Sequence, residues 1–178
     1  MEKQNFISDL HLACAKDKSR PNMQCVHFLN GYAYASDSHI IIKQSLELNN
    51  QVVGYELLEC KSIHKESFKE IRKFDIVEVT EDGFDCTSEG RKAFFPFTNI
   101  DVSEIPDFDS IIPKNSVNLS EIGVSPRYIG ILEKAMAGGN KIKMHFTGVN
   151  TGILFTSLDA DFKDQVALIM PQLLGEGS

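Results

Sequence analysis

The sequence contains no apolar run that approaches the roughly 20 residues needed to cross a bilayer. Its first residues, MEKQNF, have none of the apolar character of a secretory signal. We therefore expect a cytoplasmic protein with no membrane partner. With 178 residues and 42% hydrophobic content, the chain is long enough for one substantial core or two small ones, as in ordinary globular proteins.

The residue patterns of metal and cofactor sites are also missing. The five histidines show no HExxH or HxxxH spacing, and the acidic residues between 159 and 164 lack the EF-hand pattern. The glycines of AMAGGNK close a helix instead of opening one, so they do not form a phosphate loop. We expect no cofactor, no metal, and reduced, mostly buried thiols at four cysteines without CxxC spacing: Cys14, Cys25, Cys60 and Cys86.

The triplet Asp37-Ser38-His39 brings together the three residue types of a hydrolase triad. The side chains of a nucleophilic triad must converge on one point, and they usually come from distant parts of the chain. Neighbours in a strand point to opposite faces instead. The triplet therefore predicts a turn without catalytic function, and we expect no enzyme. A small hydrolase using Ser38 or His39 is the last of the alternatives.

The apolar and turn-forming residues predict three helices, each followed by strands. The expected helices cover 6–14, 55–73 and, with Ser125 as N-cap before Pro126, a third segment that ends at Gly138. Strands are expected within 24–48 with a turn at Asn30-Gly31, within 74–100, and within 140–174. Residues 104–115, with two prolines, are expected to form an extended connector. A threefold repeat of this kind predicts an α+β protein whose helices pack on one face of extended sheets.

Basic residues gather on the second expected helix, although the chain has a formal charge of −7. Residues 61–73 include five basic and two acidic residues, a local charge of +3 that leaves −10 for the remaining chain. One helical face with this charge is suited to DNA phosphates, and the ordinary alternative is a solvated helix with salt-bridging glutamates. The candidate DNA-binding residues are Lys61, Lys65, Lys69, Arg72 and Lys73.

Four segments resemble, in order, landmarks of the bacterial DNA polymerase III beta subunit, the DNA sliding clamp: GYAYASDSHIII, PDFDSIIPKN, IGVSPRYIGILEKAM and the terminal ALIMPQLL. The resemblance implies a DNA-clamp-like fold in a shortened, divergent relative. Residues 1–115 would form one clamp-like domain of two helix-strand halves, and residues 116–178 a half domain like the C-terminal part of a clamp. Two residues depart from the family pattern, because Ser38 replaces a glycine and Ile40 an arginine.

In clamps, partner proteins insert a short hydrophobic motif into a pocket built from three segments. The resemblance therefore implies a partner-peptide pocket made of His39, Ile40, Ile41, Pro113, Met170, Pro171 and Leu173. Apolar side chains, one of them an adaptable methionine, suit a partner's aliphatic or aromatic anchors. The alternative is that Ile40 and Ile41 fill the core and Met170 simply ends a strand.

The sequence thus favours a non-enzymatic, clamp-like accessory protein of DNA replication or repair. Its expected partners are double-stranded DNA, a hydrophobic clamp-binding peptide of a polymerase or repair protein, or both. The alternative function is a peptide-binding adaptor that mimics a clamp and does not encircle DNA. A clamp ring contains twelve halves, so three halves per chain would close as a homo-tetramer. We expect a monomer or dimer instead of a closed ring.

Overall fold

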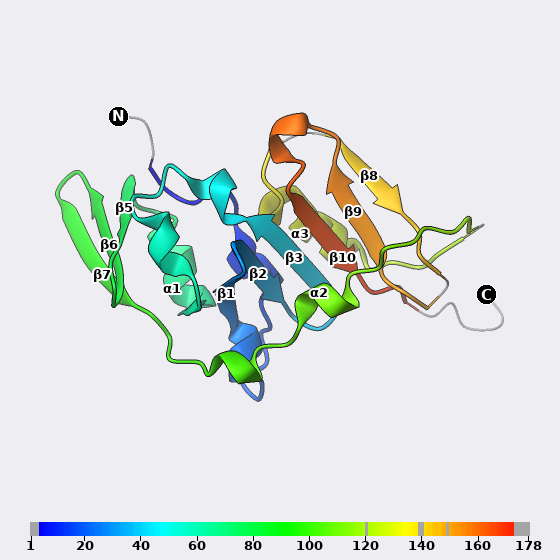
Figure 1. Ribbon diagram of the computed structural model, residues 1–178, viewed down its shortest axis with the longest axis horizontal. Helices are drawn as coiled ribbons and strands as arrows, with labels where there is room; N and C mark the ends of the chain where they lie inside the picture. The colour runs from blue at the N-terminus through cyan, green and yellow to red at the C-terminus, as the bar shows by residue number, and fades with distance from the viewer. Residues whose placement is uncertain (1–3, 120, 139–140, 149, 173–178) are drawn as a thin grey trace.

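The computed structural model describes residues 4–119, 121–138, 141–148 and 150–172. A helical segment followed by three strands occurs three times along these residues (Figure 1). The repeats, named unit 1, unit 2 and unit 3, begin with the 3-10 helix Leu10–Ala13, with α1 (Lys65–Ile71) and with α3 (Pro126–Ala135). The threefold repeat and the α+β class expected from the sequence are confirmed.

The strands of the described residues form two antiparallel sheets. The larger sheet has the order β4-β1-β2-β3-β10-β9-β8, and the smaller one has the order β5-β6-β7. The strands are β1 Cys25–Leu29, β2 Tyr32–Ser36, β3 Ile40–Ser45, β4 Lys61–His64, β5 Ile76–Val79, β6 Gly83–Ser88, β7 Arg91–Pro96, β8 Ile142–His145, β9 Ile153–Ser157 and β10 Gln165–Ile169. Because β3 of unit 1 pairs with β10 of unit 3, one sheet extends through both units.

The hairpin between β1 and β2 turns at Asn30 and Gly31, as the sequence predicts. Both residues have positive φ angles, 53° and 76°, as a two-residue type I′ hairpin turn requires. The backbone N–H groups of both donate hydrogen bonds to the Glu59 carboxylate, at 2.7 and 3.0 Å. Glu59 therefore connects the end of this hairpin to the segment that precedes β4.

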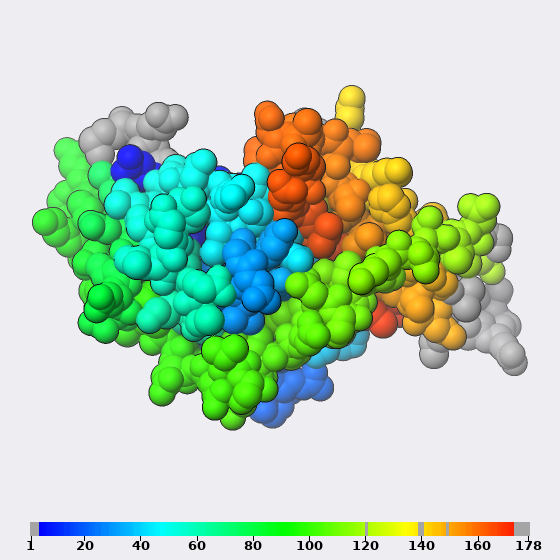
Figure 2. Space-filling model, in the orientation of Figure 1, coloured from blue at the N-terminus to red at the C-terminus, as the bar shows by residue number. Residues whose placement is uncertain are grey.

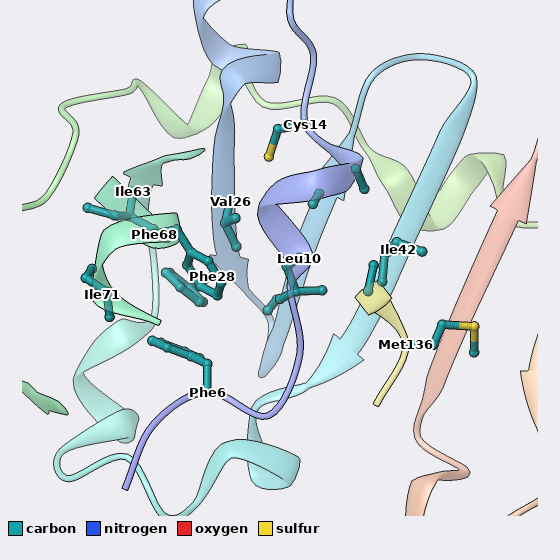
Figure 3. Close-up of a cluster of buried hydrophobic side chains, with 14 of the residues drawn as sticks. Phe6, Leu10, Cys14, Val26, Phe28, Ile42, Ile63, Phe68, Ile71 and Met136 are labelled. Carbon is teal, nitrogen blue, oxygen red and sulfur yellow. The ribbon is translucent and has the colours of Figure 1, made fainter. Parts of the chain in front are cut away.

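The helical segments that begin the three units pack on one face of the large sheet, which we call the inner face. Phe28 of β1 and Ile42 of β3 point into this core, where Phe6 contacts the ring of Phe68 from α1 at a centroid distance of 4.8 Å. Leu10 lies at the centre of the cluster, between these rings and Met136 after α3 (Figure 3). A single core therefore joins the three units.

The opposite face of the sheet, the outer face, carries a second and smaller apolar cluster. Tyr34, Ile41 and Leu168 come from three adjacent strands, and Phe108 covers them. Phe108 belongs to the connector, here taken as residues 97–117 and longer than the expected 104–115, which leads from β7 of unit 2 across this face towards unit 3 (Figure 2). The connector thus lies on the side of the sheet opposite the helices.

The expected single helix over 55–73 is wrong. The segment forms a 3-10 helix at Tyr55–Leu58, the strand β4, and only then α1. Cys60 adopts a positive φ of 61° that ends the first helical turn, and β4 pairs with β1 along its length. Pairing with a strand distant in sequence has overridden the local helical spacing of the apolar residues.

The connector is less extended than expected. It contains the 3-10 helix Val102–Glu104 and one α-helical turn, α2 (Phe108–Ile111). The Asp107 carboxylate caps α2 by accepting a hydrogen bond from the Ser110 backbone N–H at 3.2 Å. This turn brings Phe108 onto the sheet, where its side chain is only 4% exposed.

One further boundary differs from expectation, and another agrees. The N-terminal helix is confined to Leu10–Ala13, whereas α3 begins at Pro126 after the N-cap Ser125 as predicted. The division into 1–115 and 116–178 stays a prediction, because the sheet and the core both continue across it. Three further 3-10 helices lie at Pro21–Gln24, Leu46–Asn49 and Ala160–Phe162.

Candidate functional site

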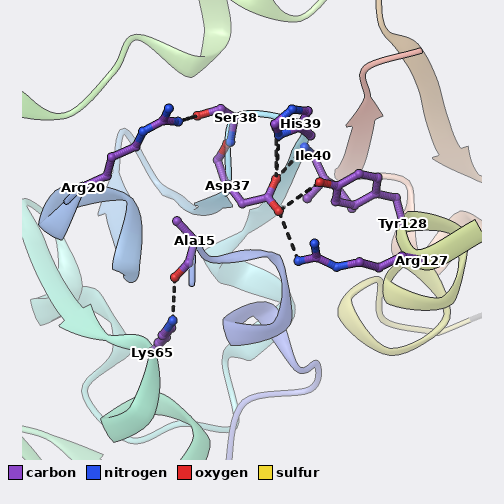
Figure 4. A network of polar contacts seen from close by, with 10 residues as sticks. Ala15, Arg20, Asp37, Ser38, His39, Ile40, Lys65, Arg127 and Tyr128 are labelled. Atoms are coloured by element: carbon purple, nitrogen blue, oxygen red, sulfur yellow. Dashed lines mark hydrogen bonds and ion pairs between the residues drawn. The ribbon is translucent and has the colours of Figure 1, made fainter. Parts of the chain in front are cut away.

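Asp37, Ser38 and His39 form the tight turn between β2 and β3. The Asp37 carboxylate accepts hydrogen bonds from the backbone N–H groups of His39 and Ile40, at 3.0 and 3.1 Å. Ser38 has a φ of 78°, in the left-handed region that is unusual for serine. Its hydroxyl accepts a hydrogen bond from Arg20 at 2.7 Å, and among the described residues none joins it to His39 (Figure 4). The nucleophile–base contact of a hydrolase is therefore not formed here.

Asp37 also attaches this turn to unit 3. The Tyr128 hydroxyl donates a hydrogen bond to the Asp37 carboxylate at 3.2 Å, and the Arg127 guanidinium lies 3.4 Å from the same oxygen (Figure 4). Burial raises the pKa of Tyr128, and the Asp37 carboxylate raises it further, so the hydroxyl stays a donor. The ring of His39 stacks on Tyr128 with an interplanar angle of 11°. The turn is thereby held between unit 1 and unit 3.

A cavity of about 200 Å³ opens on the outer face beside this turn. We call it the connector cavity, because the connector supplies one of its walls. The turn and β3 contribute His39 and Ile41. The connector contributes Pro106 and Phe108, and the end of β10 contributes Leu168 and Met170. Three segments that are distant in the sequence therefore meet around one apolar hollow.

The structure brings together only part of the pocket implied by the resemblance. His39, Ile41 and Met170 line the connector cavity, but Ile40 points to the inner face and is 0% exposed. Neighbouring residues of a strand face opposite sides, so Ile40 and Ile41 cannot both line it. Pro113 and Pro171 are not among the lining residues, and Leu173 lies outside the described residues.

Several lining residues were missed by the sequence reasoning, although two of them left a signal. Leu168 lies two positions before Met170, so a strand places both side chains on one face. Phe108 is the single aromatic residue in the sequence between positions 98 and 117, and a large apolar side chain is expected to find a surface that buries it. The connector proline that lines the cavity is Pro106, which precedes α2, and not Pro113, which follows it.

The five candidate DNA-binding residues do not form one helical stripe. Lys61 lies in β4 and donates to the backbone carbonyl of Glu81 at 3.1 Å, and Lys65 donates to the carbonyl of Ala15 (Figure 4). Ion pairs hold two others, Arg72 with Asp9 at 3.0 Å and Lys73 with Glu70. Lys69 is exposed on α1. Contact of these residues with DNA stays a prediction.

Metal-ligating side chains, helix hydropathy and thiols are the other features that bear on function in the described part of the chain. No group of three or more metal-ligating side chains occurs among its residues. None of its helices has the length and hydropathy that a membrane crossing requires. Of the four free thiols, Cys60 is exposed and the others are buried; burial raises the pKa of Cys86 to about 12. Such buried thiols are poor nucleophiles.

Solved bacterial sliding clamps share this architecture. The DNA polymerase sliding clamp from Bacillus subtilis matches with a TM-score of 0.67 and 14% identity, over 98% of this chain and 64% of the clamp. The DNA polymerase III beta chain from Streptococcus pneumoniae TIGR4 matches with a TM-score of 0.67 and 16% identity, over 94% and 62%. The C. crescentus beta sliding clamp, solved with PEG bound to a proposed beta-motif tethering region, gives 0.65 and 12%, over 94% and 62%.

No family model matches the sequence, and a search of curated proteins finds no match. The structural matches show that the chain has the fold of a DNA sliding clamp. More particularly, its fold is similar to that of the bacterial DNA polymerase III beta subunit, at a low sequence identity of 14–16%. The chain spans less than two thirds of the length of the clamps cited here. The resemblance seen in the sequence is confirmed at the level of the fold.

Proposed function

We propose that this chain is a non-enzymatic, clamp-like accessory protein of DNA replication or repair that binds a hydrophobic segment of a partner protein in the connector cavity. The observation that carries the proposal is the convergence of the turn, the connector and the end of β10 on one apolar hollow. A region described as a tethering site for a beta-motif in the C. crescentus clamp supports the same class of ligand.

The size and lining of the cavity define the ligand. Cavities for whole drug-sized ligands are typically about 300–1,000 Å³. A hollow of about 200 Å³ suits one or two side chains of an extended peptide instead. Ile41 and Leu168 supply rigid apolar walls, and Met170 is a flexible side chain that can adapt to leucine or phenylalanine. We expect a Kd on the order of 1–100 μM for a short peptide.

A peptide titration with two matched variants tests this function. The probe is a fluorescein-labelled peptide with one leucine and one phenylalanine in a serine-glycine background, followed by fluorescence polarisation. Met170→Asp places a charge in the apolar cavity and should weaken binding at least about tenfold. Met144→Asp introduces the same charge on the exposed strand β8, where Met144 is 44% exposed, and should bind as the wild type does.

Two outcomes would contradict the proposed function. One is that the wild-type protein does not bind the labelled peptide at concentrations up to about 1 mM. The other is that Met170→Asp binds as tightly as Met144→Asp. Circular dichroism of both variants separates a loss of binding from a loss of folding.

The adaptor that does not encircle DNA is the second candidate function. Four of the five candidate DNA-binding residues already interact with groups of the chain itself, which makes them less available to phosphates. Both candidates use the connector cavity, and they differ in whether duplex DNA binds as well. Measuring the affinity of the protein for duplex DNA, with and without the α1 substitution Lys69→Glu, distinguishes them.

A further inference from the structure

The carboxylate of Asp109 lies between the connector and two strands of the large sheet. One of its oxygens accepts a hydrogen bond from the Tyr34 hydroxyl of β2 at 3.0 Å. Its other oxygen lies 2.7 Å from the Lys43 ammonium of β3. These partners are 75 and 66 positions away in the sequence, so both contacts fasten α2 to the sheet.

Aromatic contacts surround the same carboxylate. The ring of Phe108 stacks on that of Tyr34, with centroids 5.4 Å apart and an interplanar angle of 17°. The Lys43 ammonium lies 3.9 Å from the centre of the Tyr32 ring, a cation–π contact. We call the three polar side chains Tyr34, Lys43 and Asp109 the connector clasp.

The four residues of α2 cannot hold a position by themselves. An isolated helix needs about 12–15 residues to be even marginally stable in water, so a single turn depends on tertiary contacts. Two residues of this turn, Phe108 and Ile111, line the connector cavity from the side facing Ile41 and Leu168. The width of the cavity is therefore set by where α2 rests on the sheet.

There is room for α2 to rest elsewhere. A second hollow, of about 410 Å³, lies beside the clasp and is lined by Tyr32, Lys43, Asp109, Ile112, Lys114, Lys163, Asp164 and Val166. Two clasp residues, Lys43 and Asp109, line this hollow and do not line the connector cavity. Without its polar contacts, the turn of helix can shift towards the second hollow and widen the first.

We propose that Asp109 is a positioning residue for peptide binding: through Tyr34 and Lys43 it fixes α2 at the distance from the sheet that lets the connector cavity grip an apolar side chain. This inference rests on the proposed function. It adds that the position of α2 controls the affinity for the peptide and the choice of the peptide side chain that enters the cavity. Burial of Tyr34, which raises its pKa, together with the adjacent Asp109 carboxylate keeps the hydroxyl protonated and able to donate.

Three variants test the clasp with the labelled leucine-phenylalanine peptide. Asp109→Ala removes both polar contacts and should weaken peptide binding about tenfold, the effect of losing hydrogen bonds to a charged group. Asp109 lies in the first turn of α2, where a carboxylate favours the helix, so Tyr34→Phe, which leaves Asp109 in place, separates the lost contact from a weaker α2. Asp109→Asn keeps an acceptor for Tyr34, and Tyr34→Phe keeps the ring stack, so each should lose about threefold.

Two further readouts separate positioning from a general loss of structure. Hydrogen exchange of residues 105–113 should become faster in Asp109→Ala, and the preference for leucine over alanine at the anchor position should fall. Asp85→Ala is the control, since it removes an exposed carboxylate of the small sheet and should change neither. Should Asp109→Ala fail to fold, Tyr34→Phe carries the same test.

The outcomes distinguish the clasp from the proposed function. Peptide binding by the wild type, with unchanged affinity and unchanged exchange in Asp109→Ala, overturns the clasp alone. Absence of peptide binding by the wild type overturns the proposed function and the role of the clasp together. The proposal is supported if Asp109→Ala binds the peptide more weakly than the wild type and exchanges the amides of residues 105–113 faster. The control Asp85→Ala should then behave as the wild type does.

Discussion

Ser38 has a left-handed backbone conformation, which is unfavourable for a residue with a side chain. Its φ of 78° is needed for Asp37 to cap the turn and for His39 to reach the ring of Tyr128. A residue other than glycine in the left-handed region costs about 1–2 kcal/mol. The hydrogen bond from Arg20 offsets part of this cost, but both side chains are exposed. The turn that borders the connector cavity is therefore under strain.

Replacing Ser38 by glycine should relieve that strain. The free energy of unfolding is expected to stay equal or to rise by up to about 1 kcal/mol. Ser125 is the matched control, because it has a φ of −71° and makes no side-chain cap hydrogen bond. Ser125→Gly should lower the free energy of unfolding by about a few tenths of a kcal/mol. Urea denaturation of both variants checks this, and a clear destabilisation by Ser38→Gly would contradict the strain.

Individual site residues could be predicted only where they belong to a recognisable pattern. His39, Ile41 and Met170 belong to segments that resemble the clamp family, and the structure brings them together. Ile40 was misplaced because the resemblance was transferred without applying the alternation of a strand. Phe108 and Asp109 were missed, since their contacts with Tyr34 lie far away in sequence and no local pattern encodes them.

At the scale of elements, α3 and the hairpins were predictable because their signals are local. A proline after Ser125 begins α3, and Asn30 with Gly31 forms the β1–β2 turn. The structure of segment 55–73 was not predictable, because β4 forms a strand through its pairing with β1 about 35 residues away. Because Lys61 lies in β4 and not in a helix, it does not belong to the expected basic stripe. The five basic residues therefore lack the regular helical spacing on which that prediction was based.

We therefore expect helix α1 to contact fewer DNA phosphates than the sequence predicted. Lys69 is the exposed basic residue of α1 itself, and we expect weak duplex binding that falls with salt by roughly 0.9 in log–log slope for each phosphate contact. Lys69→Glu should abolish the binding that electrophoretic mobility shift detects. Lys92→Glu, on the exposed strand β7 of the other sheet, should have a smaller effect. Equal binding by wild type and Lys69→Glu would remove α1 from DNA contact.

At the scale of the whole molecule, the sequence predicted the threefold repeat but not its arrangement. The order of the large sheet places unit 1 at the centre, with β4 on one side and unit 3 on the other. This order follows from pairings such as β3 with β10, which join residues more than a hundred positions apart. Such contacts depend on the cooperative packing of the full core, and no local spacing reports them.

The assembly in solution stays a prediction of monomer or dimer. Three units per chain would need four chains to complete a ring of twelve. Light scattering coupled to size-exclusion chromatography should therefore give the mass of one or two chains. A mass of four chains would contradict this expectation and favour a closed ring.

The central claim is that the connector cavity binds a hydrophobic peptide, and methyl NMR of the whole protein tests it most directly. On titration with the leucine-phenylalanine peptide, the methyl signals of Ile41, Leu168 and Met170 should shift together and saturate at one Kd. Signals of the exposed Ile129 and Ile142, around α3 and β8, should stay unchanged. Shifts centred on Ile129 and Ile142, or no shifts at saturating peptide, would contradict the account.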